Sequence, residues 1–81
     1  MTKKLLELGF KPGQVVYCKH GMIRTEKNGE KTDTVAEGGK GTVVRWAHGD
    51  FITVDWENPL AGPSKQTSKA SWLLVSTALG W

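Results

Sequence analysis

Cysteine is nearly absent from this chain of 81 residues, and the chain has no long apolar run and no strong excess of one charge. The single cysteine, Cys18, cannot form an internal disulfide, whereas small secreted domains usually contain several. Every apolar run is shorter than the roughly 18 to 20 residues of a membrane-spanning helix. Glu7, Gly9 and Lys11 interrupt the apolar segment that a signal peptide would need. We therefore expect a cytoplasmic protein with no membrane partner.

The composition indicates one folded domain. Hydrophobic residues make up 38% of the chain and charged residues 23%, which is too apolar and too weakly charged for a disordered chain. So short a chain has no room for a second domain or a large catalytic cleft. We predict a single domain over residues 1–81, with the barrel core in residues 13–76. The net charge of +3 permits a nucleic-acid or an acidic protein partner and requires neither.

Local signals predict short strands joined by turns that contain glycine. Residues 2–8 fit a short helix that would need docking to be stable. Residues 14–19 fit a strand, because they are rich in residues that suit a pleated sheet. Gly38-Gly39-Lys40-Gly41 indicates a turn. Residues 57–68 are expected to form a loop and residues 70–76 a final strand.

Asn28-Gly29 is the clearest local signal. The dipeptide favours a two-residue type I′ hairpin turn, because both central positions need positive φ. Opposite charges and one threonine pair then face each other across the hairpin, as an antiparallel ladder favours. The tip is polar on both faces and should project into water, while Met22, Ile23 and Val35 at the base join the core. The predicted pairs are Lys27 with Glu30, Glu26 with Lys31, Thr25 with Thr32, Arg24 with Asp33, Ile23 with Thr34, and Met22 with Val35.

A second hairpin is predicted from the pattern of residues 42–56. Apolar residues alternate with others over residues 51–56, which places Ile52, Val54 and Trp56 on the core face. In the preceding strand, over residues 42–46, Val43 and Val44 compete for the core, and a bulge would let both contribute. We assign Trp56, and Trp72 in the final strand, to the core.

The order of these elements resembles an SH3-like barrel: a strand, a long hairpin-like excursion, a glycine turn, a tight hairpin, a loop and a final strand. The excursion lies where such barrels have their RT loop. Gly38-x-x-Gly41-Thr42-Val43 followed by Ile52-x-Val54-x-Trp56 is similar to the core hairpin of KOW-type and mind-bomb-type barrels. Gly39-Lys40-Gly41-Thr42-Val43 is faintly similar to CAP-Gly domains, whose Gly-Lys-Asn-Asp-Gly groove motif is absent. The resemblance implies an all-β fold, a small barrel of about five strands with a projecting β-hairpin, and no single function.

No residue pattern indicates catalysis. The glycine turn at residues 38–41 lacks the spacing of a phosphate loop and leads into a strand instead of a helix. Cys18, His20 and His48 lack the spacing of a structural zinc site, and a Cys-His nucleophile would also need an orienting third group and a pocket. A plain core cysteine is the preferred interpretation. The acids within residues 50–57 are expected to be solvated charges without a cleft to separate their pKa values. We therefore expect a protein that is no enzyme and has no cofactor, no metal and no small-molecule substrate.

Aromatic and basic side chains supply the candidate binding residues. Tyr17, Trp46 and Phe51 are predicted at hairpin ends or opposite the core, and exposed aromatics are enriched at interaction hot spots. Closing the ends of the barrel is the alternative role for these three. The full candidate set is Tyr17, Arg24, Lys27, Lys40, Arg45, Trp46, Phe51, Lys65 and Lys69.

Three functions remain open. The preferred one is a small regulatory module that binds another protein through the exposed aromatics and the charged hairpin around Asn28-Gly29. Its charges are mixed, where a nucleic-acid surface should show one sign. The second is a KOW-type protein that binds DNA or RNA, with Trp46 or Phe51 stacked on bases. Its phosphate contacts would come from Lys40, Arg45, Lys65 and Lys69. The third is a structural subunit of a larger complex, in which another chain completes an open sheet edge.

Overall fold

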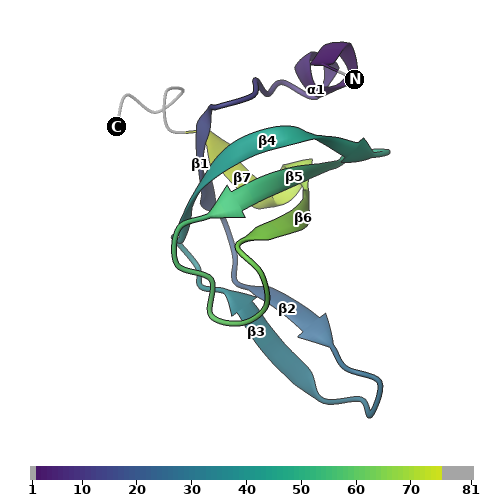
Figure 1. Ribbon diagram of the computed structural model, residues 1–81, viewed down its shortest axis with the longest axis vertical. Helices are drawn as coiled ribbons and strands as arrows, with labels where there is room; N and C mark the ends of the chain where they lie inside the picture. Colours follow the sequence, from purple (N-terminus) through teal and green to yellow (C-terminus); the bar gives the residue numbers. More distant parts are fainter. Residues whose placement is uncertain (1, 76–81) are drawn as a thin grey trace.

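Strands form about half of the residues that the computed structural model describes, which are residues 2–75 (Figure 1). The antiparallel five-stranded sheet has the order β6-β5-β4-β1-β7, and β2 and β3 form a separate hairpin that projects from it. This confirms a mostly β fold with a short N-terminal helix; the described strands form no closed barrel. No helix in residues 2–75 is long and apolar enough to cross a membrane. The elements are α1 (Thr2–Glu7), β1 (Val15–Cys18), β2 (Met22–Thr25), β3 (Lys31–Val35), β4 (Lys40–His48), β5 (Phe51–Trp56), β6 (Lys65–Lys69), the 3₁₀ helix η1 (Ala70–Trp72) and β7 (Leu73–Val75).

One apolar cluster packs on the inner face of the five-stranded sheet. Its members along β5 confirm the predicted alternation, because Ile52 and Val54 are 0% exposed and Trp56 is 1% exposed. Leu5 of α1 and Phe10 are buried in the same cluster, so the core begins before residue 13. The short helix is thus docked through one leucine. The other buried members are Val16, Cys18, Met22, Val35, Val43 and Leu73.

The hairpin turn predicted at Asn28-Gly29 is wrong in type and register. Glu26 N–H donates to Glu30 O at 2.7 Å, which closes a three-residue loop. Gly29 has φ +88°, but no non-glycine residue of the described chain has positive φ, which excludes a type I′ turn. The ladder therefore shifts by one residue, and the expected cross-strand charge pairs do not form. The observed pairs are Thr25 with Lys31, Arg24 with Thr32, and Ile23 with Asp33.

A bulge at the base of this hairpin restores one predicted pair. The register shifts between Met22 and Ile23, so that Met22 lies opposite Val35 as expected. Met22 and Val35 are buried. Ile23 was predicted to join them, but it is 60% exposed, because the bulge turns it away from the core.

β4 and β5 form the second hairpin with the predicted bulge. The register shifts between Val43 and Arg45, so Val43 is buried and Val44 is half-buried. β4 begins at Lys40, within the segment 38–41 that was predicted to form the glycine turn. The turn instead lies just before β4, where Gly39 N–H donates to Ala36 O at 2.9 Å. His48 pairs with Phe51, so the connecting loop is shorter than the predicted four residues.

The C-terminal part of the fold differs most from the sequence-based expectation. The predicted loop at residues 57–68 ends early, because β6 pairs along its length with β5. The predicted strand at residues 70–76 is split into η1 and β7, and Ser76 lies outside the described residues. Trp72, assigned to the core from the sequence, is 39% exposed, while Leu73 is buried. The 3₁₀ helix leaves Trp72 at the surface and places Leu73 in the core.

Candidate binding groove

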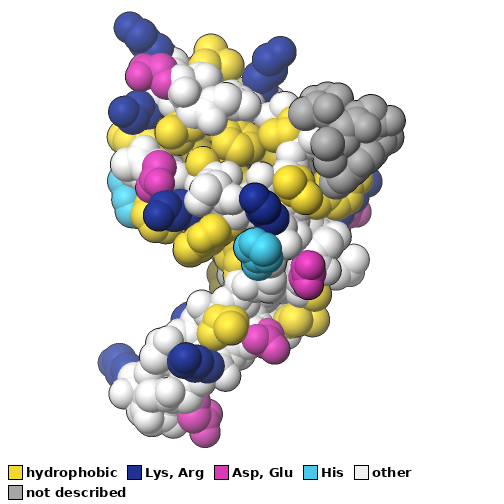
Figure 2. Space-filling view, turned by 180° about the vertical axis from the view of Figure 1, so that it is seen from behind, with side chains coloured by type: hydrophobic (Ala, Val, Ile, Leu, Met, Phe, Trp, Pro, Cys, Tyr) yellow, Lys and Arg dark blue, Asp and Glu magenta, His cyan; other side chains and the backbone are white. Residues whose placement is uncertain are grey.

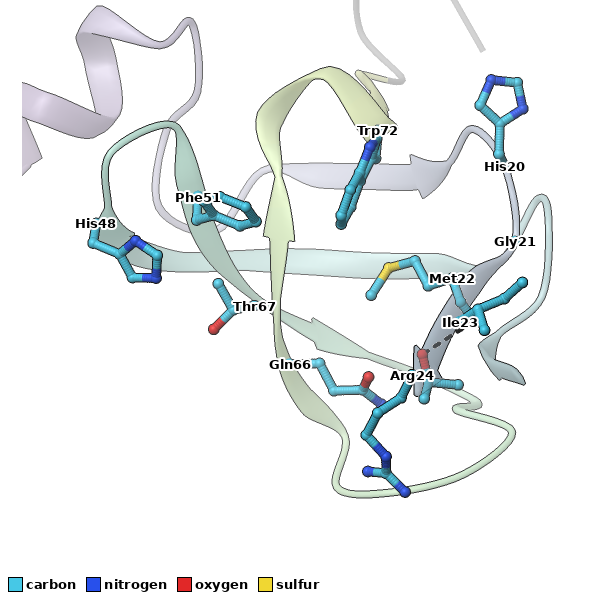
Figure 3. A pocket seen from close by; sticks show the side chains of 11 residues that line it. His20, Gly21, Met22, Ile23, Arg24, His48, Phe51, Gln66, Thr67 and Trp72 are labelled. Atoms are coloured by element: carbon cyan, nitrogen blue, oxygen red, sulfur yellow. Dashed lines mark hydrogen bonds between the residues drawn. The ribbon is translucent and has the colours of Figure 1, made fainter. Parts of the chain in front are cut away.

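A groove of about 650 Å³ lies where the projecting hairpin leaves the five-stranded sheet. Segments that are far apart in the sequence form its walls: the base of β2, the end of the β4–β5 hairpin, β6 and η1 (Figure 3). Its lining residues are His20, Gly21, Met22, Ile23, Arg24, Thr34, His48, Phe51, Gln66, Thr67 and Trp72.

Three contacts hold the base of the hairpin, one to the sheet, one within the hairpin and one to a loop. The hydroxyl of Ser68 on β6 donates to the Met22 thioether at 3.3 Å, in the buried interior. The hydroxyl of Thr34 donates to Met22 O at 3.2 Å. Leu60 N–H donates to Thr34 O at 2.8 Å, which ties the loop after β5 to the same point. Met22, buried by these contacts, lies between Trp72 and Ile23 in Figure 3.

Aromatic side chains form the opposite wall. Phe51 and Trp72 meet edge to face, with ring centroids 6.0 Å apart and an interplanar angle of 88°. His48 lies over Phe51 with a centroid distance of 5.0 Å. The edge-to-face pair contributes about 0.5–1.5 kcal/mol beyond burial, so the wall is pre-formed. Trp72 nevertheless keeps an exposed face that a partner could cover.

The rim of the groove holds few charges. Arg24 Nη2 lies 2.9 Å from Glu26 Oε1, and both side chains are largely solvent-exposed, so this pair contributes little to stability. Gln66 Nε2 donates to Ala61 O at 3.1 Å and to Pro63 O at 2.9 Å, which holds the loop before β6. No aspartate or glutamate is among the lining residues.

Two of the predicted binding residues, Arg24 and Phe51, line the groove, and the other seven lie elsewhere. Trp46 shares the core face with Ile52 and packs against the core. Its indole N–H donates to Gly49 O at 2.8 Å, so it closes the end of the hairpin. Lys27 is at the tip of the β2–β3 hairpin, where Figure 2 shows both signs of charge.

The strand register places the remaining candidates on the outer face of the sheet, because directly opposed residues share a face. Tyr17, half-buried in β1, lies opposite Lys40. Lys40 Nζ is 3.7 Å from Glu57 Oε2, which partly offsets its charge. The other three candidates lie opposite residues of β5 that face away from the core. Arg45 lies opposite Thr53, Lys65 opposite Asp55, and Lys69 opposite Phe51.

Sequence reasoning missed most of the groove. Trp72 stands in a run of four apolar residues, and such a run does not show which member faces inward. Ile23 was assigned to the core, since the bulge beside it leaves no mark in the sequence. His20 and His48 were weighed only as metal ligands or as partners of a cysteine nucleophile. In residues 2–75 no three His, Cys, Asp or Glu side chains gather as a metal site.

Cys18 is a core residue, as expected. It is 1% exposed, and its thiol donates to His20 O. Burial raises the pKa of the Cys18 thiol, against the lowering effect of this hydrogen bond. A protonated, buried thiol is poorly suited to act as a nucleophile.

The chain matches no protein-family model, no curated protein and no solved structure.

Proposed function

We propose that this protein is a non-enzymatic module that binds another protein, and that the groove is its binding site. The supporting observation is that exposed apolar side chains gather there: Ile23 is 60% exposed and Trp72 is 39% exposed. Exposed apolar surface of this kind, next to an aromatic pair and an arginine, is typical of interaction sites. The buried, unpaired Cys18 is consistent with the reducing cytoplasm as its location.

We further propose that the fold is an SH3-like barrel. The order of elements supports this: β1, the β2–β3 excursion, the glycine turn, the β4–β5 hairpin, a loop, β6 and, after η1, the strand β7 follow one another. β1 pairs with both β4 and β7, which brings the first and last strands together. The fold does not by itself decide the function.

Alanine substitutions in the groove should weaken partner capture. We expect Trp72→Ala and Ile23→Ala to lower the affinity for the protein partner by about 30-fold, equivalent to the roughly 2 kcal/mol of a hot-spot residue. The measurement is affinity capture from the native host's extract, with mass spectrometry to identify the partner, followed by titration with the purified partner.

Two exposed leucines outside the groove provide matched controls. Leu60 is 58% exposed and Leu6 is 51% exposed, close to the exposure of Ile23, and neither lines the groove. Leu60→Ala and Leu6→Ala should leave capture unchanged. The groove would be refuted as the binding site if the groove and control variants lost affinity equally, or if none of them changed capture.

Binding to DNA or RNA is the second candidate, and one observation favours it. Lys40, Arg45, Lys65 and Lys69 share the outer face with Phe51, although Asp55 and Glu57 reduce the charge there. If nucleic acid is the partner, affinity must fall steeply with salt, because each neutralised phosphate releases counterions. Lys65→Ala with Lys69→Ala would then lower both the affinity and the salt slope. We expect instead that nuclease treatment leaves capture unchanged.

A further inference from the structure

β6 is an edge of the five-stranded sheet, and β5 is its only partner among the described strands. Two hydrogen bonds bracket its ladder. At one end Trp56 N–H donates to Ser64 O at 2.8 Å, and at the other Ala70 N–H donates to Asp50 O at 2.8 Å. Hydrogen-bonded pairs recur at every second residue of an antiparallel ladder. The even-numbered residues of β6 are therefore the ones bonded to β5.

The odd-numbered residues of β6 present their backbone outward. Gln66 and Ser68 lie opposite Val54 and Ile52 and use their N–H and C=O groups in the ladder. The N–H and C=O groups of Lys65, Thr67 and Lys69 are directed to the open edge instead, and within residues 2–75 no strand pairs with it. This edge is a ready template for another strand.

The open edge borders the groove. Gln66 lines the groove from the inner face of β6 and Thr67 from the outer face, while Met22 and Ile23 line it from β2. Successive side chains of a strand laid along β6 would alternate between the outer face and the inner face. Those on the inner face would enter the groove beside Met22 and Trp72, which lie near each other in Figure 3.

The charges on β6 determine which kind of segment can pair with its open edge. Lys65 and Lys69 lie on the outer face, four residues apart, with Thr67 between them. A second copy paired antiparallel about Thr67 would set Lys65 against Lys69 twice, and like charges directly opposite are destabilising. Acidic residues at the same two positions would be favourable. Lys65 already lies opposite Asp55, whereas Lys69 lies opposite Phe51, so an acid opposite Lys69 should contribute more.

We propose that β6 binds an extended segment of a partner protein by β-strand addition, and that this segment alternates acidic and apolar residues. Its acidic side chains pair with Lys65 and Lys69, and its apolar side chains enter the groove. This inference rests on the proposed function, since it names the class of partner for the same groove. Main-chain hydrogen bonds give such complexes affinity, and alternate side chains give them specificity.

A pair of synthetic peptides of equal composition tests the proposal. The first, Gly-Glu-Val-Thr-Val-Glu-Gly with blocked ends, sets its acids four residues apart. The second, Gly-Val-Glu-Thr-Glu-Val-Gly, moves the acids to the other face. We expect the first to half-saturate the protein at a concentration about tenfold lower. In the same register the second loses both charge pairs and the apolar contacts, and a slip of one residue lets only one of its acids meet Lys65 or Lys69. At saturation, hydrogen exchange of the Thr67 and Lys69 amides should slow at least tenfold, with little change at Gln66 and Ser68.

Two further variants separate strand addition from simple charge attraction. N-methylation of the peptide's threonine, whose N–H faces β6 in the antiparallel arrangement, should abolish binding, whereas N-methylation of a neighbouring valine should not. Lys65→Glu with Lys69→Glu should reject the acidic peptide and accept Gly-Lys-Val-Thr-Val-Lys-Gly. Equal binding of the two acidic peptides, or no binding of either, would overturn the inference. If the captured partner still required Trp72, the proposed function would stand while strand addition failed; slowed exchange at Thr67 upon addition of DNA or RNA would overturn both.

Discussion

Trp56→Ala is expected to lower the free energy of unfolding by about 3–5 kcal/mol, as large aromatic deletions in cores do. Trp56 is 1% exposed and lies at the end of the buried row that includes Ile52 and Val54. A domain of this size has little spare stability, so the variant should be largely unfolded at room temperature. Circular dichroism during urea and thermal denaturation measures the change.

Trp72→Ala is the matched control for this variant. Trp72 is 39% exposed, and its contact with Phe51 contributes only about 0.5–1.5 kcal/mol beyond burial. Trp56→Phe provides a folded variant, because the Trp56 indole N–H is buried with no hydrogen-bond partner in the described chain and its removal leaves no acceptor unpaired. We expect the free energy of unfolding of Trp56→Phe to lie between that of the parent protein and that of Trp56→Ala. A Trp56→Ala protein as stable as Trp72→Ala would show that the core is elsewhere.

β5 was predictable because one of its faces is buried and the other is not. Ile52, Val54 and Trp56 alternate with half-buried residues, and a shift of one residue would move all three out of the core. The short helix was also predictable, although its docking through Leu5 required the packed core. Apolar periodicity therefore identified these parts of the fold.

The hairpin register was not predictable from Asn28-Gly29. This dipeptide suits a two-residue type I′ turn, but it also suits a three-residue loop in which only glycine takes positive φ. The hairpin tip is polar on both faces, so no buried side chain selects between these registers. The pairing of the two strands is fixed at the base of the hairpin, where Met22 and Val35 must both reach the core. A bulge beside Met22 makes up the shift of one residue between the register at the tip and the register at the base.

The groove was hidden because its walls come from segments with weak signals. β6 is polar throughout, and only Ser68 of its residues is buried. Its pairing with β5 follows from hydrogen bonding along a sheet edge, which leaves no apolar pattern in the sequence. The base of β2 and Trp72 meet it only after the sheet has formed. A sequence pattern shows each face separately but does not show which faces meet.

Gly41→Ala should be the second most damaging substitution, although it adds a single methyl group. Gly41 lies opposite Trp56 in the ladder. A β-carbon there would lie 2.6 Å from Val54 Cγ1 and 2.7 Å from Trp56 Cε3, closer than packed atoms can approach. Overpacking of a core costs typically about 1–3 kcal/mol, and this site is enclosed on two sides, so we expect a value near the upper end. The midpoint of urea denaturation measures it.

Gly21→Ala is the control for the added methyl group, and a double substitution tests the cause. A β-carbon at Gly21 would lie 3.6 Å from Val35 O, an ordinary contact, so the change should be within about 0.5 kcal/mol. If Gly41→Ala is costly because its methyl group collides with the Trp56 ring, Trp56→Ala removes part of that collision. The double substitution Gly41→Ala with Trp56→Ala should then cost less than the sum of the two single changes, since contacting residues are not additive. A strictly additive pair would mean that the cost of Gly41→Ala comes from the collision with Val54 Cγ1 and not from the one with the indole ring.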